Sequence, residues 1–269
     1  MMESETVASS SGPTGSLPTA AELQAELLEI PAPPEQPPQI TPPGYEDALA
    51  VALKYVKAKR GGDLAGVILV GSGARRAITP HSDIDLIVLV KGSGEGHEIV
   101  RVADRLVDIR YGGHLSVSEQ VEDSLRLPPL LRKGRILYDH DGIAAKLIEK
   151  AAQRFRQGPP PASINEQIRL KAECLHWLDK AHDLADKSAT AQYLLQIFFD
   201  ETITAFFRVR GLWLTAPVDV LRFMVSRDQG LGDSAARFLS APTVPEQIDA
   251  GRRLADLLFK DIPQPARID

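Results

Sequence analysis

The chain has little of what marks secreted or membrane-spanning proteins. Only one of its 269 residues, Cys174, is a cysteine, so no disulfide can form within the chain. A lone thiol is typical of a reducing compartment. No apolar run approaches the ~20 residues of a transmembrane helix, and the first residues lack the basic and apolar segments of a signal peptide. We therefore expect a cytoplasmic protein with no membrane partner.

Positive charge is also scarce. Lys and Arg number 31 against 36 Asp and Glu, which gives a net charge of -5 and argues against a basic nucleic-acid footprint. The chain contains no Gly-Lys-Ser/Thr phosphate loop, which disfavours a P-loop kinase. His176 and His182 lie in a predicted helix without metal-ligand partners at useful spacing, which disfavours a zinc site.

The composition divides the chain into a tail, two folded parts and a linker. Residues 1–43 are rich in serine and proline and lack aromatics, so we expect a disordered tail with one short helix around Ala20 to Ile30. Residues 157–163 read Gln-Gly-Pro-Pro-Pro-Ala-Ser, which predicts a hinged and stiffened linker. Two folded parts, 44–156 and 164–269, remain.

The two folded parts differ in their periodicity, which makes the fold class α+β. In the first part, we expect a helix over 45–59, strands over 67–70 and 84–90, a hairpin over 97–103 and 105–111, a helix opened by Ser116 or Ser118, a strand over 135–138 and a helix over 143–156. In the second part, we expect only helices, over 164–187, 189–210, 217–227, 231–240 and 245–260. A small sheet with flanking helices should therefore precede an α-helical bundle.

The strongest functional signal lies between Val67 and Val90. An apolar run ends in Gly71-Ser72, and after ten intervening residues Asp83-Ile84-Asp85 opens a second apolar run. Carboxylates two apart on a strand point to one face, where they can share a metal-ion cluster. A Gly-Ser turn can bring backbone N–H groups against a phosphate. Together these features predict a site for a nucleoside triphosphate.

Asp108 is the expected third acid. It lies in the middle of a predicted strand with apolar neighbours, where an unpaired carboxylate is costly to bury. We favour a role as a metal ligand beside Asp83 and Asp85. The alternative is an ion pair with Arg110 or Arg101 across the hairpin.

These residues resemble the nucleotidyltransferase superfamily that includes DNA polymerase β. Its signature is Gly-Ser or Gly-Gly, about ten residues, Asp-x-Asp and a third acid on a later strand. The chain is most similar to small bacterial members, the kanamycin and other aminoglycoside nucleotidyltransferases and the minimal nucleotidyltransferases. The resemblance rests on specific motifs over about residues 45–150. Over 164–260 it rests only on a helical bundle in the expected place. It implies a mixed-sheet nucleotidyltransferase domain over 44–156 and an acceptor-binding bundle over 164–269.

The resemblance also implies a reaction. A nucleoside monophosphate, AMP from ATP being the expected case, would pass to a hydroxyl of an aminoglycoside-like acceptor with release of pyrophosphate. Two Mg²⁺ ions would be held by Asp83, Asp85 and Asp108 for an in-line displacement. Gly71 and Ser72 would bind the β- and γ-phosphates.

Three further residues near the motif are candidates for nucleotide binding. Arg75 matches an arginine of the family pattern Gly-Ser-x-Ala-Arg-Gly, and we favour phosphate or scaffold contact over a solvated turn residue. Arg76 stands where the pattern has glycine, so it can alter the turn or add a second cation over the triphosphate. Ser82 either caps the turn or bonds within the metal site.

The general base is expected from the helical part. In kanamycin-type enzymes a glutamate of that part accepts the acceptor's proton, and Glu201 is the matching candidate beside its neighbour Asp200. The alternative, to which we give slightly more weight, is an ion pair between Glu201 and Arg208 or Arg169.

Two other functions stay open. A toxin-type nucleotidyltransferase would modify a tRNA 3′ end or a protein side chain, and a positive rim would favour RNA, whereas an acidic cleft would favour a cationic aminoglycoside. An inactive nucleotide-binding module would be expected if one metal acid were absent, and all three are present. The sequence does not indicate the oligomeric state.

Overall fold

The computed structural model describes residues 41–75 and 77–265. These residues fall in the larger of two units into which the chain divides, Pro38–Asp269. Most of the expected tail, its short helix around Ala20 to Ile30 and Arg76 therefore lie outside the described residues. Within the described ranges, no helix is long and apolar enough to cross a membrane.

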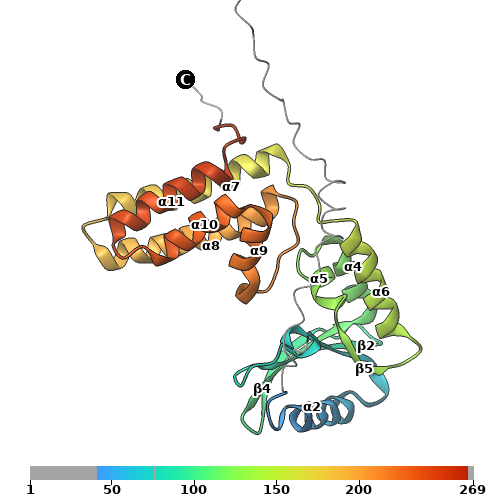
Figure 1. The fold of residues 1–269 in the computed structure, drawn as a ribbon. Helices are drawn as coiled ribbons and strands as arrows, with labels where there is room; N and C mark the ends of the chain where they lie inside the picture. Colours follow the sequence, from blue (N-terminus) through green and yellow to red (C-terminus); the bar gives the residue numbers. More distant parts are fainter. Residues whose placement is uncertain (1–40, 76, 266–269) are drawn as a thin grey trace, which may run out of the picture. The chain divides into compact units, whose positions relative to one another are not determined.

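A five-stranded sheet in the order β3-β4-β2-β1-β5 forms the first part of the fold (Figure 1). β2 pairs in parallel with β4, and the other neighbouring pairs are antiparallel, so the predicted mixed sheet is confirmed. Its strands are β1 (Leu64–Val70), β2 (Ile84–Val90), β3 (Gly96–Val102), β4 (Arg105–Gly113) and β5 (Arg135–Asp139).

Both faces of the sheet are covered by helices, which explains why β1 is apolar and buried at every position. α2 (Tyr45–Arg60) covers one face, whose buried residues include Val67, Leu69, Leu86, Val88 and Ile109. α4 (His114–Asp123), α5 (Leu127–Leu131) and α6 (Ile143–Arg156) cover the other, whose buried residues include Ile68, Ile87 and Leu89.

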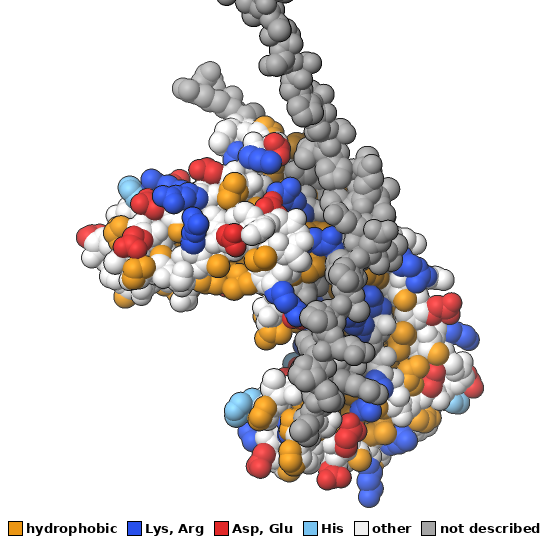
Figure 2. All heavy atoms as spheres, viewed as in Figure 1, with side chains coloured by type: hydrophobic (Ala, Val, Ile, Leu, Met, Phe, Trp, Pro, Cys, Tyr) orange, Lys and Arg blue, Asp and Glu red, His pale blue; other side chains and the backbone are white. Residues whose placement is uncertain are grey.

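The second part is helical, as predicted. Its elements are α7 (Ile164–Asp183), α8 (Ser188–Val209), η2 (Pro217–Asp219), α9 (Val220–Arg227), α10 (Gln229–Ser240) and α11 (Val244–Leu258). Its core contains aromatic rings, and the Phe238 ring lies 5.5 Å from that of Phe198 and 5.1 Å from that of Phe199. Figure 2 shows acidic and basic side chains interspersed over the visible face of this part, so the two signs of charge are not segregated there.

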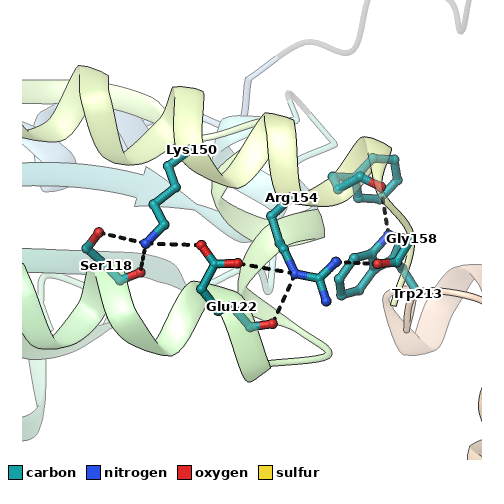
Figure 3. Close-up of polar contacts among 7 residues, drawn as sticks. Ser118, Glu122, Lys150, Arg154, Gly158 and Trp213 are labelled. Atoms are coloured by element: carbon teal, nitrogen blue, oxygen red, sulfur yellow. Dashed lines mark hydrogen bonds and ion pairs between the residues drawn. The ribbon is translucent and has the colours of Figure 1, made fainter. Parts of the chain in front are cut away.

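Arg154 ties the end of α6 to the linker and to the segment after α8 (Figure 3). Its Nε donates to the carbonyl oxygen of Glu122 at 3.0 Å, and its guanidinium also donates to the Gly158 carbonyl. The same guanidinium lies 5.2 Å from the ring of Trp213, whose indole N–H donates to the Phe155 carbonyl at 2.9 Å. These contacts fix where the linker leaves the sheet-containing part.

Some local expectations are wrong. α4 begins at His114, and Gly113 precedes it without a capping side chain, so neither Ser116 nor Ser118 opens it. The sequence patterns do not predict α5, which is short and carries prolines at its start. Proline is tolerated there because the first backbone N–H groups of a helix have no acceptor within the helix. The expected Gly-Ser turn is the first half of a single helical turn, α3 (Gly71–Ala74).

Candidate active site

Parallel pairing of β2 with β4 places two acids side by side. Asp85 lies directly opposite Asp108 in the register, so both side chains lie on one face of the sheet. Asp83 is exposed and immediately precedes β2, and the intervening Ile84 is buried. The face is the one that α4, α5 and α6 cover elsewhere, since Ile87 follows Asp85 two positions along β2.

The pKa of Asp85 responds to its burial and to the two neighbouring acids. The pKa of Asp85 is raised to about 6, first by partial burial and then by the charges of Asp83 and Asp108, and Arg110 and Arg75 offset part of this rise. The first cause is desolvation of the charged carboxylate, and the second is repulsion between like charges. The three acids therefore form one negative cluster with Asp85 at its centre.

Asp108 is held by two neighbours on the hairpin. Its Oδ1 lies 3.0 Å from His97 Nε2 and accepts a hydrogen bond from Arg110 Nε at 3.4 Å. The ion pair with Arg110 that was considered from sequence is thus formed. In the part of the chain that the structure describes, no three His, Cys, Asp or Glu side chains converge closely enough to enclose a metal ion.

His97 is a site residue that the motifs do not reveal. It stands opposite Arg110 in the antiparallel pairing of β3 with β4. Arg110 is two residues after Asp108 on β4, so His97 and Asp108 are diagonal neighbours on one face of the sheet. Only the cross-strand register brings it to Asp108. The one sequence signal for this position is the alternation of β3, which places His97 on the same face as Ile99 and Arg101.

Gly71 permits the close approach of the turn to Asp85. Its φ is +66°, and a Cβ at this position would lie 2.1 Å from Asp85 Oδ2. A Cβ on Gly73 would lie 2.1 Å from the hydroxyl of Tyr45. The turn thus rests on the acid cluster and on Tyr45, and glycine is needed at both positions.

Two buried hydroxyls at this turn lack partners. Ser72 Oγ and the Tyr45 hydroxyl have no hydrogen-bond partner among the described residues. Burial, and then the charge of Asp85, raise the pKa of Tyr45 to about 12, so this hydroxyl keeps its proton. Buried polar atoms are normally satisfied, so the orphaned Ser72 Oγ, next in the chain to Gly71, is an unusual feature of this turn.

Arg75 and Ser82 have defined contacts. Arg75 Nε donates to the Gly71 carbonyl at 3.3 Å, and its NH1 donates to Asp219 Oδ2 at 3.0 Å. Ser82 Oγ accepts from the Thr79 backbone N–H at 2.8 Å, which is the turn-capping contact considered for it. Its carbonyl accepts from Arg105 at 3.1 Å, so Ser82 holds the loop that delivers Asp83.

The ion pairs considered for Glu201 are not formed. Arg208 pairs with Glu166 at 2.7 Å, and Arg169 pairs with Glu173 at 2.6 Å. Glu201 is partly buried on α8, and neither it nor the exposed Asp200 has a hydrogen bond or ion pair with a described residue. Glu201 thus remains free to act on a ligand, although no contact links it to the acid cluster.

Comparison with known proteins agrees with this geometry. Residues 49–170 match the model of a family described as the nucleotidyltransferase domain. These residues form a nucleotidyltransferase domain. The matched span includes the whole sheet, the Gly-Ser turn and the three acids of the cluster.

A crystal structure of a nucleotidyltransferase-like protein from Exiguobacterium sibiricum 255-15 is also similar. The two sequences are 14% identical, the similarity covers 80% of this chain and 74% of that chain, and the TM-score is 0.47. No curated protein matches the chain.

Gly71→Ala tests whether the nucleotidyltransferase domain needs glycine beside Asp85. We expect it to lower the free energy of unfolding by about 3 kcal/mol, because it combines left-handed backbone strain with a clash against Asp85. Gly211→Ala is the matched control, since Gly211 has a φ of +61° and open space around a Cβ. It should cost about 1 kcal/mol. Urea unfolding measures both, and equal losses would contradict the close approach.

Asp85→Asn tests the raised pKa of Asp85 through the pH dependence of stability. The folded-state pKa of Asp85 is about 6, above its ordinary value of 3.8, so the folded state binds a proton that the unfolded chain has lost. Ionisation of Asp85 therefore removes stability as the pH rises from about 4 to about 6. With EDTA present, the variant should be more stable than the parent above pH 6 and match it below pH 4. Asp104→Asn, in an exposed turn, is the control. A pH-independent difference between Asp85→Asn and the parent would contradict the raised pKa of Asp85.

Proposed function

We propose that this chain transfers a nucleoside monophosphate, AMP from ATP in the first instance, to a hydroxyl group and releases pyrophosphate. The single observation that carries the proposal is the cluster of Asp83, Asp85 and Asp108 beside Gly71, next to a buried Ser72 Oγ without a described partner. The match to the nucleotidyltransferase domain supports the same chemistry.

The acid cluster suits divalent magnesium. Its donors are carboxylate oxygens, which hard cations prefer. Burial and then the charges of Asp83 and Asp108 raise the pKa of Asp85, and a bound cation would offset both effects. Asp83 and Asp85 would hold the metal, joined by Asp108 once it leaves His97 and Arg110. Two bound Mg²⁺ ions would neutralise the triphosphate and stabilise the pyrophosphate leaving group.

The residues of the chain take the remaining roles. Ser72 Oγ and the backbone of Gly71 bind the triphosphate, and Arg75 adds positive charge beside them. The acceptor oxygen forms a bond to the α-phosphorus while the bond from that phosphorus to the β-bridging oxygen breaks. Pyrophosphate leaves with the bridging oxygen, and Glu201 accepts the hydroxyl proton.

We propose a small hydroxyl-bearing acceptor such as an aminoglycoside. Asp200 and Glu201, two acids on α8 without partners among the described residues, favour a cationic acceptor. RNA is the second candidate. The exposed Arg101 and Arg110 lie on β3 and β4, the hairpin that carries Asp108, and arginines suit a phosphate backbone.

The proposed reaction is tested by a pyrophosphate-release screen. Each nucleoside triphosphate is combined with a panel of aminoglycosides or with total tRNA, in Mg²⁺ buffer. We expect release with one acceptor class, and loss of release in Asp83→Asn and Asp85→Asn, because each removes a metal-binding carboxylate. Asp104→Asn should keep the parent rate. Full release by either acid variant would show that the site is misassigned.

Glu201→Gln tests the proton acceptor separately. It should lower kcat by at least about 10²-fold and leave the KM for the nucleotide unchanged, because it removes only the general base. Asp200→Asn, its exposed neighbour, controls for the loss of charge on α8. A decrease of only a few-fold in kcat would assign Glu201 a structural role.

A further inference from the structure

Lys133 lies at the end of β1, close to the Gly-Ser turn. β5 runs antiparallel to β1, with Arg135 opposite Leu69, so the residues that precede β5 lie beside the residues that follow β1. Gly134 packs tightly there, since a Cβ on it would lie 2.6 Å from Ile68 Cγ2. Lys133 immediately precedes Gly134, and its backbone is therefore fixed beside Gly71.

The Lys133 ammonium has no hydrogen bond or ion pair with any described residue. The residue is exposed. Desolvation by the surrounding protein, and then the charges of Arg132 and Arg75, lower the pKa of Lys133, whereas the charge of Asp219 raises it. Lys133 is thus within electrostatic range of Arg75 and Asp219, although it belongs to a different segment from either. An exposed ammonium without a protein partner is accessible to an anion, and the charge of that anion stabilises its protonated form.

Positive charge exceeds negative charge around Asp219. Its Oδ2 pairs with Arg75 at 3.0 Å and its Oδ1 with Arg222 at 2.5 Å, so one carboxylate serves two guanidinium groups. Lys133 adds a third cation. Arg75 in turn lies near Asp85, whose pKa its charge lowers. An anion bound among these cations would therefore lie between Asp219 and the acid cluster.

We propose that Lys133 and Arg75 bind the terminal phosphates of the triphosphate, and that Asp219 is the internal anion which those phosphates replace on Arg75. The inference rests on the proposed function, because it takes a triphosphate as the ligand. It adds a binding residue, Lys133, from outside the Gly-Ser and Asp-x-Asp motifs. It also predicts the direction in which Asp219 acts. Its carboxylate competes with the phosphates for Arg75 and therefore weakens their binding.

The experiment measures binding of inorganic tripolyphosphate and of a nucleoside monophosphate to the full chain, by isothermal titration calorimetry in Mg²⁺ buffer. Lys133→Gln should weaken tripolyphosphate binding about tenfold, because one charged contact is lost, and leave monophosphate binding unchanged. Lys133→Arg should restore most of the affinity. Lys54→Gln is the matched control, because Lys54 is an exposed lysine on α2, which covers the opposite face of the sheet.

Asp219→Asn should change tripolyphosphate affinity in the opposite direction from Lys133→Gln. Removal of the competing carboxylate should tighten tripolyphosphate binding by about threefold or more. Weaker binding in this variant, together with unchanged melting temperature, would show that Asp219 only positions Arg75 and would overturn its proposed role. Unchanged affinity in Lys133→Gln would overturn the role of Lys133.

Failure of this inference and failure of the proposed function are distinguishable. If the parent releases pyrophosphate and Lys133→Gln keeps the parent KM for the nucleotide, the reaction stands and the inference is wrong. If Lys133→Gln loses tripolyphosphate affinity but no nucleotide yields pyrophosphate with the parent, the anion site stands and the transfer reaction is wrong.

Discussion

The site depends on the parallel pairing of β2 with β4, which forces Asp85 and Asp108 onto one face as direct neighbours. Two like charges at this separation repel, and burial of Asp85 strengthens the repulsion because less water screens it. Pairing of all of β2 with Val107–Gly113 of β4 holds the two acids together against this cost. The backbone ladder thus stabilises the position of Asp85 beside Asp108.

The glycines of the turn follow from the same constraint. Asp85 Oδ2 occupies the space that a side chain on Gly71 would need, and the Tyr45 hydroxyl does the same at Gly73. The turn therefore lies directly on the acid cluster, with Ser72 Oγ buried between glycines and unpartnered among the described residues. Close packing of backbone on carboxylate brings together the turn for which we propose phosphate binding and the acids for which we propose metal binding.

Local sequence patterns predict most of the elements and little of how their side chains meet. Continuous apolar runs reveal β1 and β2, and period-3.6 patterns reveal α6 and the bundle, because those patterns are set by burial on one chain segment. The pairing of Asp108 with His97 depends on the β3–β4 register. The proximity of Lys133 to Arg75 depends on β5 lying beside β1, which are more than 60 residues apart in the chain. Neither contact leaves a signal in a local window.

Glu201 shows the same limit, because the ion pairs that the sequence suggests for it are not formed. Its position on α8 predicts a carboxylate beside the packed stripe, and the structure places it there, partly buried. Its partner cannot be read from spacing. Arg208 lies two turns along α8 and Arg169 lies on α7, and they pair with Glu166 and Glu173 instead. Competition among several acids for few arginines is settled by tertiary packing, which single-segment reasoning does not contain.

The residues around the Gly-Ser turn carry charge of both signs, and this bears on the kind of ligand that we propose. Asp83, Asp85 and Asp108 carry negative charge, whereas Arg75 and Lys133 carry positive charge that Asp219 offsets in part. A simple anion would be repelled by the acids, and a simple cation would not pair with the basic residues. A divalent metal complexed with a polyphosphate carries both signs in one ligand, so its binding lowers the electrostatic energy of both groups of residues at once.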